Sequence, residues 1–480
     1  MVVDKKKLER QYIGVDRWFN SSLYGALFDK QGTYNYATGV GKTYTAILVI
    51  KRLFRTEHNH NIVIIVPSEA LLQQWKVELG KHFTKKELNR IEVFTVHWVA
   101  LNKVKIKTNT LIVDELHEYL GDEFYKVIDG TYIQYDNNLG LTATYEDSKK
   151  RHLKLKSFYP IVDKITEEEA IAEGYISPFI EFNLAVELTQ KEQEDYAAYT
   201  TVISNNINKF GRGGLELATK CLSGGVHKDG KRYTAAHFVY GWAGHKGWTR
   251  NLNLDNPQDA EIDALWNPHL IFGYAQKLLN AIRFRKNILY NCSSKIEVIK
   301  ALTLQFNDLK TIVFSQSTNF ADKLNLLLNE QEENSSVVYH SKLATIMLPS
   351  PKTGKLIKCG KTRLKRQAIE RITTGQSRII CTASSLDKGF DVQDMSLGVT
   401  ASGTSNFTQY KQRGGRVKRK DIFNVNNVVL LINLYVKDSK DEIWLKKRQS
   451  TSTHIIHWVD SINDVSFTPR DRNEFTINDI

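Results

Sequence analysis

The stretch Ala37-Thr38-Gly39-Val40-Gly41-Lys42-Thr43 stands between a strand-like run and a segment with helical periodicity, and this predicts a strand, a tight turn and a helix. A glycine-rich turn at such a junction lets several backbone N–H groups point at one phosphate. We expect Lys42 to reach the β- and γ-phosphates of a nucleotide, and Thr43 to hold Mg²⁺. The strict pattern has glycine where this chain has Tyr36. A chance glycine turn is therefore the alternative that other residues must exclude.

Two acidic residues follow a second buried run further along the chain. Thr110–Val113 is apolar and strand-like, and Asp114 and Glu115 come directly after it. Ligands bind at the carboxyl ends of the strands in open α/β sheets. We expect Asp114 to hold Mg²⁺ and Glu115 to orient and deprotonate an attacking water. An isolated acidic pair is more often a solvated turn, but together with the glycine turn it predicts nucleotide hydrolysis.

Short apolar runs alternate with helical patterns in two separate stretches, which predicts two doubly wound α/β domains with parallel sheets. We place these domains at residues 1–165 and 291–440, followed by a C-terminal tail at 441–480 that is partly disordered. The predicted strands are Tyr34–Tyr36, Ile62–Val66, Val93–Val96, Thr110–Val113 and Gly140–Thr142 in the first domain, and Thr311–Phe314, Val337–His340, Ser377–Thr382, Gly398–Thr400 and Val428–Asn433 in the second.

Residues 185–290 break this alternation, and we treat them as an inserted accessory region. The segment is rich in glycine, aromatic and basic residues, among them Trp242 and Trp248. Aromatic side chains among lysines and arginines can stack on unpaired bases, so both tryptophans are candidate nucleic-acid contacts. A small satellite core with a solvated rim is the equally weighted alternative. The histidines of this segment have no metal-site spacing with cysteines or carboxylates.

A third element, Gln412-Arg413-Gly414-Gly415-Arg416-Val417-Lys418-Arg419, belongs to the second α/β series. Arginines three residues apart share one face of a helix. Arg416 and Arg419 can therefore meet a γ-phosphate together and stabilise the charge that builds during phosphoryl transfer. Alone, the segment would be an ordinary basic helix end. As the partner of the glycine turn, it predicts a nucleotide site completed at a domain interface.

These elements occur in the order found in superfamily-two helicases, which the chain resembles. The glycine turn, DELH at Asp114–His117 and the QRGGRVKR segment resemble motifs I, II and VI. Val66-Pro67-Ser68, with Leu71 and Trp75 after it, resembles motif Ia, Leu141–Thr144 motif III, Val313–Ser315 motif IV and Thr382–Asp391 motif V. DELH, GLTAT and Tyr175–Phe179 are similar to segments of phage branch-migration helicases, XPB-like helicases and restriction-enzyme motors. The resemblance implies two RecA-like motor domains that share one ATPase site.

The resemblance also implies roles for residues outside the three strongest motifs. Gln11, after Arg10, would read adenine, and Gln412 would take part in catalysis. Gly389 and Asp391 would lie close to the nucleotide, while Thr142 and Thr144 would couple the nucleotide state to domain movement. Small hydroxyls and backbone N–H groups grip phosphates without reading sequence. The residues expected along one tracking strand are Pro67, Ser68, Thr95, Ser315 and Thr382.

Charge and cysteine usage agree with an intracellular nucleic-acid partner. Lys and Arg number 66 against 53 acids, a net charge of +13, which suits a polyanion. We expect phosphate contact from a basic loop at Leu348–Lys365, because no acid lies between Glu333 and Glu370. The four cysteines have neither zinc nor redox spacing, which favours reduced thiols and the cytoplasm, or the host cytoplasm for a phage-encoded chain. No apolar run approaches the ~20 residues of a membrane span.

We therefore expect an ATP- and Mg²⁺-dependent helicase or translocase that acts on single-stranded, forked or branched DNA by unwinding or branch migration. Three alternatives remain open at this stage. An RNA helicase would share nearly all of these motifs, and the motor subunit of a restriction system would need a nuclease on another chain. A nucleotide-gated clamp would bind nucleic acid without travelling along it. Protein partners, polarity and the preferred junction are not indicated.

Overall fold

The strand, turn and helix predicted around Gly39–Lys42 open a parallel sheet. The structure is a computed structural model that describes residues 5–146, 150–227, 229–349, 355–383, 394–419 and 428–466. In these ranges six parallel strands pair in the order β3-β2-β4-β5-β1-β6. They are β1 Gln31–Tyr36, β2 Ile62–Val66, β3 Ile91–Thr95, β4 Ile106–Asp114, β5 Ile133–Thr142 and β6 Ile161–Ile165.

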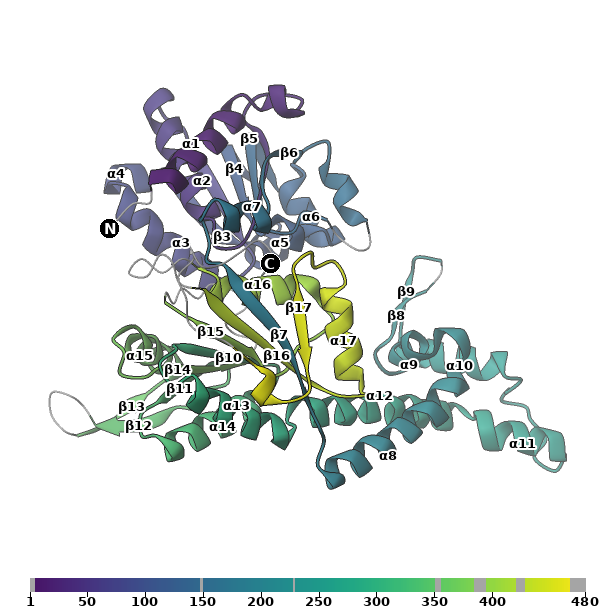
Figure 1. Cartoon of the computed structure of the whole chain (residues 1–480). Coiled ribbons are helices and arrows are strands. Elements are labelled where there is room, and N and C mark those ends of the chain that lie inside the picture. Colours follow the sequence, from purple (N-terminus) through teal and green to yellow (C-terminus); the bar gives the residue numbers. More distant parts are fainter. Residues whose placement is uncertain are drawn as a thin grey trace. The chain divides into compact units, whose positions relative to one another are not determined.

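A second sheet contains seven strands from the same described ranges, in the order β11-β14-β10-β15-β16-β7-β17 (Figure 1). Its members are β7 Phe179–Val186, β10 Thr311–Ser315, β11 Ser336–His340, β14 Ile379–Ala383, β15 Leu397–Thr400, β16 Val429–Val436 and β17 Ile456–Val459. β10, β11, β14, β15 and β16 form a parallel series. The predicted fold class, two α/β domains with parallel sheets, is confirmed.

Helices connect these strands in both sheets. Those of the first are α1 Lys5–Phe19, α2 Lys42–Thr56, α3 Glu69–His82, α4 Lys85–Leu88, α5 Val96–Asn102, α6 Asp122–Ile128 and α7 Glu167–Ala172. Those of the second are α13 Ser293–Gln305, α14 Thr318–Gln331, α15 Lys361–Thr373, α16 Phe407–Val417 and α17 Lys440–Gln449. Single 3-10 turns lie at Ser21–Tyr24, Leu116–Tyr119, Arg151–Leu155, Asn208–Gly213 and Ile462–Asp464.

Two helix caps explain where β2 and β3 end. The Ser68 hydroxyl accepts a hydrogen bond from the Leu71 N–H at the start of α3, and the Thr95 hydroxyl accepts one from the Trp98 N–H at the start of α5. Caps of this kind satisfy N–H groups that have no partner inside the helix. The strand predicted at Val93–Val96 therefore ends one residue earlier than expected, since Val96 is already helical.

The second sheet extends beyond the boundaries predicted for its domain. β7 precedes the inserted region in the chain, and β17 lies within the segment predicted as a C-terminal tail; the two pair in parallel, with Ile456 opposite Glu181. The prediction of a tail is therefore wrong at α17 and β17. Four residues of mixed polarity are too short a run to reveal an edge strand by alternation.

The basic segment expected as a loop is mostly regular structure. Ile346–Pro349 forms β12 and Leu356–Cys359 forms β13, an antiparallel pair in which Met347 lies opposite Lys358. Helix α15 follows directly, anchored by the buried side chains of Ala368 and Ile372. The loop prediction is therefore wrong at β12 and β13, because four-residue strands are too short to be recognised by alternation. The helical pattern at Leu364–Ile372 predicts a helix there, and α15 covers it with three more residues at its start and one at its end.

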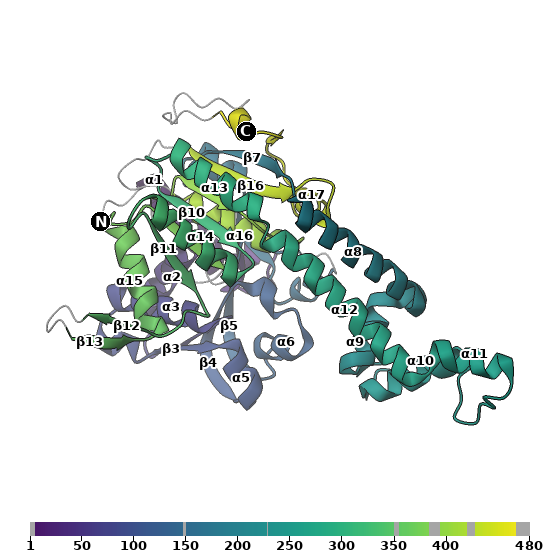
Figure 2. The ribbon, with the colours of Figure 1, turned by 90° about the horizontal axis from the view of Figure 1, so that it is seen from below.

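The chain from Val186 to Val298 is a second compact unit, separate from the unit that contains both sheets. Its helices are α8 Gln190–Ile207, α9 Gly214–Ser223, α10 Ala235–His245, α11 Pro257–Trp266 and α12 Pro268–Tyr290, with a small hairpin of β8 Gly225–Val226 and β9 Arg232–Tyr233. α8 and α12 run side by side in Figure 2. Phe210, Cys221, Ile271 and Leu278 belong to a core of its own.

Candidate nucleotide site and nucleic-acid contacts

The glycine turn has the backbone that a phosphate cradle requires. Gly39 and Gly41 have φ angles of 95° and 101°, which side-chain-bearing residues rarely adopt. Lys42 begins α2 directly after the turn, and its Nζ donates to the Tyr36 carbonyl oxygen at 3.3 Å. A helix N-terminus and its exposed N–H groups favour an anion at this position. Thr38 and Val40 lie in the same turn, and Thr43 is the second residue of α2.

Tyr36 does not disturb the turn, although the strict pattern has glycine there. It is the last residue of β1 and fully buried, and its ring stacks on Tyr34. Its hydroxyl donates to the Asp163 carboxylate at 2.5 Å. The side chain therefore packs with the sheet, and the turn itself spans Ala37–Gly41. The departure from the pattern is accommodated by the strand.

Helix α1 supports the turn from one side. Lys7 Nζ donates to the Gly39 carbonyl oxygen at 2.8 Å, and Gln11 Nε2 donates to the Val40 carbonyl oxygen at 3.1 Å. The two side chains are four residues apart and so share one helix face. A Cβ on Gly41 would lie 2.6 Å from Gln11 Nε2 and displace its amide, and the φ of 101° itself favours glycine there. Side chains of α1 therefore satisfy two carbonyl oxygens of the turn.

Asp114 is the last residue of β4 and Glu115 follows it, so the acidic pair lies at the carboxyl end of the strand. Asp114 is buried, and its burial together with the charge of Glu115 raises its pKa to about 6. One carboxylate oxygen accepts from the Glu115 N–H at 3.0 Å, and the other accepts from Trp75 Nε1 at 2.9 Å. Glu115 has a φ of 53°, a conformation that is uncommon for a residue with a side chain.

A hydrated cation fits this edge of the sheet. Within the part of the chain that the structure describes, Glu115 Oε2 is buried without a hydrogen-bond partner. Such an oxygen is costly unless a ligand or water satisfies it. The Lys42 ammonium also favours the ionised form of Asp114. Carboxylate and hydroxyl oxygens with room for water are the ligands that Mg²⁺ prefers, and the side chains of Asp114 and Thr43 carry oxygens of these two kinds.

His117 links the acidic pair to Thr142, and sequence reasoning gave it no role. Its Nδ1 lies 3.0 Å from Thr142 Oγ1 and 3.5 Å from Glu115 Oε2. Thr142 Oγ1 in turn accepts from the Thr144 N–H at 3.1 Å. The His117 imidazole therefore connects Thr142, at the end of β5, with Glu115, directly after β4. The fourth position of DELH was the signal that could have identified it.

Helix α16 carries Arg416 and lies against the glycine turn, but it ends at Val417, so Arg419 follows the helix and does not share its face as predicted. A Cβ on Gly415 would overlap the Thr38 side chain, and a Cβ on Gly39 would lie 3.8 Å from Arg419 Cγ. Burial lowers the pKa of Arg419 to about 10. Gln412 is buried on the same helix, and Arg416 is half-buried. Both sheets therefore supply residues to one place.

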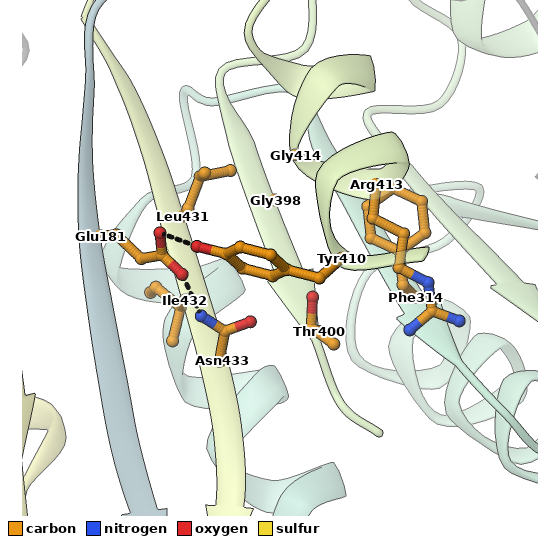
Figure 3. A pocket seen from close by; sticks show the side chains of 10 residues that line it. All are labelled: Glu181, Phe314, Gly398, Thr400, Tyr410, Arg413, Gly414, Leu431, Ile432 and Asn433. Atoms are coloured by element: carbon orange, nitrogen blue, oxygen red, sulfur yellow. Dashed lines mark hydrogen bonds between the residues drawn. The ribbon is translucent and has the colours of Figure 1, made fainter. Parts of the chain in front are cut away.

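A polar network beneath α16 holds the helix (Figure 3). The buried Glu181 carboxylate of β7 accepts from the Tyr410 hydroxyl at 2.7 Å and from Asn433 Nδ2 at 2.6 Å. Burial alone would raise the pKa of Glu181, but the hydrogen bond and charge of His454 hold it below its ordinary value. The adjoining cavity of about 20 Å³ has room for roughly one water. This site orients α16 and is too small for a nucleotide.

Ion pairs fix the other side of α16 to α7. Lys418 Nζ lies 2.7 Å from Glu167 Oε1, and Lys411 pairs with the same carboxylate. Burial disfavours the charged form of Glu167, but the two lysines hold its pKa well below its usual range. Arg413 donates to the carbonyl oxygens of Ser402 at 2.8 Å and Ser315 at 3.3 Å. Lys411, Arg413 and Lys418 therefore position the helix. Arg416 on the helix and Arg419 just after it are the candidates for nucleotide contact.

Comparison with known proteins agrees with this geometry. Residues 26–147 match the family described as type III restriction enzyme, res subunit, and residues 294–421 match the family described as helicase conserved C-terminal domain. The glycine turn and the acidic pair fall in the first match, and α16 falls in the second. The chain is a superfamily-two helicase. This assignment makes it a nucleic-acid-dependent ATPase, and helicases of this kind use ATP, typically with Mg²⁺.

Two relatives give the extent of the likeness. The helicase is 25% identical over 435 residues to the DNA 3′-5′ translocase XPB2 of Sulfurisphaera tokodaii (strain DSM 16993 / JCM 10545 / NBRC 100140 / 7), which covers 88% of this chain and 82% of that protein. The crystal structure of the Pyrococcus furiosus Hef helicase domain is similar at a TM-score of 0.48 and 15% identity, over 91% of this chain and 98% of that one. No helix in the described ranges is long and apolar enough to cross a membrane.

The predicted strand-tracking residues lie at the carboxyl ends of neighbouring strands. Pro67 and Ser68 follow β2, and Thr95 ends the adjacent β3. Ser315 ends β10, and Thr382 is the last residue but one of the neighbouring β14, where it lies opposite Phe314; both are buried. The Thr382 hydroxyl has no partner among the residues whose placement is described. Gly389 and Asp391 of motif V lie outside the described residues.

Trp242 and Trp248 lie in the second unit of the helicase. Trp242 Nε1 donates to the Lys209 carbonyl oxygen at 3.1 Å, and Trp248 Nε1 donates to Asp263 Oδ1 at 2.7 Å. Both rings are partly buried against the core of this unit. The structure thus places them in the satellite core that the sequence analysis weighed against base stacking. The described part of the unit contains no metal-binding cluster of His, Cys, Asp or Glu side chains.

Proposed function

We propose that this helicase is a DNA translocase that hydrolyses ATP between its two sheets and moves along one strand in the 3′-to-5′ direction. The contact between the Thr38 end of the glycine turn and Gly415 of α16 carries the proposal, because it brings the predicted phosphate cradle and the predicted arginines together. The substrate and the direction are proposed from the similarity to XPB2, a DNA 3′-5′ translocase.

The nucleotide would be held and cleaved by residues of both sheets. Lys42 would bind its β- and γ-phosphates, and Thr43 and Asp114 would hold Mg²⁺, which supplies positive charge beside the phosphates. Glu115 would orient the attacking water, and Arg416 and Arg419 would stabilise the charge that develops on the transferred group. We propose adenine recognition by Gln11, a catalytic role for Gln412 and domain coupling through Thr142 and Thr144.

The strand would lie across the carboxyl edges of both sheets, along Pro67, Ser68, Thr95, Ser315 and Thr382. Helix N-termini follow Ser68 and Thr95, and exposed N–H groups of this kind bind phosphates without regard to sequence. A forked or branched DNA, with branch migration as the outcome, is the finer proposal. It is tested by the choice of substrate below.

A basic surface on β13 and α15 suits the remaining phosphates, and we call it the β13–α15 surface. Its lysines and arginines make no ion pair with any carboxylate that the structure describes, unlike Lys81, Lys126 and Lys446, which pair with acids on their own helices. Unpaired like charges repel one another, and a polyanion relieves this repulsion. The members of the surface are Lys355, Lys358, Lys361, Arg363, Lys365 and Arg366.

Removing three charges from this surface should weaken DNA binding. We expect the triple variant Lys358→Ala/Lys361→Ala/Arg366→Ala to bind single-stranded DNA about 10-fold less tightly and to lower the salt slope of log K by about 2, since each phosphate contact on a single strand contributes roughly 0.7. ATPase activity without DNA should stay unchanged. The matched control, Lys81→Ala/Lys126→Ala/Lys446→Ala, removes the same charge from paired positions. Equal loss of affinity in both variants would mean that net charge alone attracts DNA.

The substrate is tested by measuring ATPase rates with single-stranded DNA, duplex DNA, a fork, a four-way junction and RNA as separate activators. We expect every DNA with an accessible single strand to stimulate hydrolysis more than RNA does. A flat response to all five would contradict a nucleic-acid motor, and a preference for RNA would favour an RNA helicase. Displacement of streptavidin from one end of a biotinylated strand measures direction. Stimulation without displacement from either end would indicate a clamp that does not travel.

A further inference from the structure

Trp75 contacts the catalytic centre from the interior of the first sheet domain. Its side chain is 1% exposed and belongs to the main apolar core, yet its indole N–H donates to Asp114 Oδ2 at 2.9 Å. A hydrogen bond to a buried carboxylate is stronger than one between neutral groups. With Oδ1 accepting from the Glu115 N–H, both oxygens of Asp114 are oriented. Asp114 therefore cannot turn without breaking a bond to α3.

The same helix begins at the proposed DNA contact. Ser68 is the N-cap of α3, and Trp75 lies seven residues further on, about two helical turns away. Leu72 and Leu79 lie on the same buried face as Trp75, so α3 is held along its length. A helix fixed at both ends transmits a displacement of its first turn as a rigid element. The proposed DNA contact at Ser68 is therefore connected to the Asp114 carboxylate by helix α3 and by the hydrogen bond from Trp75.

We propose that Trp75 is a positioning residue that holds Asp114 for Mg²⁺ and transmits DNA binding at the start of α3 to the ATPase site. The inference rests on the proposed function, because it requires DNA at Ser68. Because Trp75 is buried and bonds to Asp114, its effect on the nucleotide would pass through that carboxylate. The proposed effect depends on the indole N–H of Trp75. The ring itself packs in the core, as any large apolar side chain would.

Trp75→Phe removes this N–H while keeping an aromatic ring. We expect the Mg²⁺-dependent gain in ATP affinity to fall about 10-fold, in proportion to the loss of one hydrogen bond to a charged group. ATP affinity without Mg²⁺ and affinity for single-stranded DNA should remain unchanged. Stimulation of the ATPase by DNA should fall about 10-fold, through a lower kcat. Calorimetry with and without Mg²⁺ provides the reading that is independent of turnover.

Trp18→Phe is the matched control within the same core. Trp18 is fully buried, and its indole N–H donates at 2.9 Å to the Asn138 carbonyl oxygen, away from Asp114. This variant should lose comparable thermal stability while keeping the Mg²⁺ dependence and the DNA stimulation of the wild type. In an Asp114→Asn background, Trp75→Phe should have no further effect on the Mg²⁺-dependent affinity, which a double-mutant cycle measures.

Identical behaviour of Trp75→Phe and Trp18→Phe would overturn the proposal and leave Trp75 a core residue. A weakened Mg²⁺ response with full DNA stimulation would overturn the transmission through α3. The double-mutant cycle is also decisive if Trp75→Phe is poorly folded. A loss of Mg²⁺-dependent ATP affinity that persists in the Asp114→Asn background comes from packing. Failure of the proposed function has a different signature, since wild-type ATPase would then show no stimulation by DNA at all.

Discussion

Glu115→Gln is expected to lower ATP turnover by at least ~100-fold while ATP affinity stays close to that of the wild type, as loss of a water-orienting base should. The left-handed φ of 53° turns this residue out of the line of β4, and its Oε2 has no hydrogen-bond partner in the described ranges. Gln keeps the size of the side chain and removes the basic oxygen. The effect should therefore appear in kcat and not in binding.

Glu118→Gln is the control, because Glu118 is half-buried on the 3-10 turn that follows and is not expected to touch nucleotide. Turnover is measured at saturating ATP and DNA, and affinity is measured with a fluorescent nucleotide. Near wild-type turnover by Glu115→Gln would show that another group activates the water. Loss of nucleotide binding would instead place Glu115 in the binding contacts.

Arg416→Ala and Arg419→Ala are expected to cut hydrolysis by ~100-fold or more and to leave ATP affinity within a few-fold of the wild type. Guanidinium groups that meet the γ-phosphate act mostly on charge that develops in the transition state. The contact of α16 with the glycine turn brings Arg419 next to Gly39 before any nucleotide is bound. The helix therefore has the placement that such a role requires.

Arg413→Ala gives the contrasting result on the same helix. Arg413 is buried and donates to two backbone carbonyl groups, so its loss should lower the melting temperature and all activities together. The comparison needs melting curves, ATP affinity and single-turnover hydrolysis for the three variants. A large fall in melting temperature with normal specific activity for Arg416→Ala and Arg419→Ala would make them structural residues as well. Arg419→Lys tests whether charge alone is sufficient.

Much of the nucleotide site could be predicted because its signals are local in sequence. Gly39 and Gly41 are required by their backbone angles, and Asp114 and Glu115 follow an apolar strand, so each group can be recognised within a few residues. The N-cap positions of Ser68 and Thr95 depend on equally short spacings. Their roles toward nucleotide and DNA stay predictions, because geometry alone does not measure binding or turnover.

Other features depend on residues far apart in the chain. The Trp75–Asp114 bond joins positions 39 residues apart, and the Glu181–Tyr410 bond joins positions 229 apart. Tryptophan and tyrosine in apolar segments have the pattern of ordinary core residues. The neighbouring sequence therefore does not predict which carboxylate each side chain will bond. The same holds for Trp242 and Trp248, whose partners decide whether they are core residues or DNA contacts.

The sequence by itself determined the strand–turn–helix, the acidic pair, the arginine helix and the two parallel sheets, because each rests on a period or spacing shorter than about one element. Only the tertiary structure decided that β7 and β17 complete the second sheet, that β12 and β13 pair in the segment expected as a loop, and that α16 lies against the glycine turn. Edge pairing and helix docking are determined by burial and hydrogen bonds between distant segments, and these compete with local preference and override it.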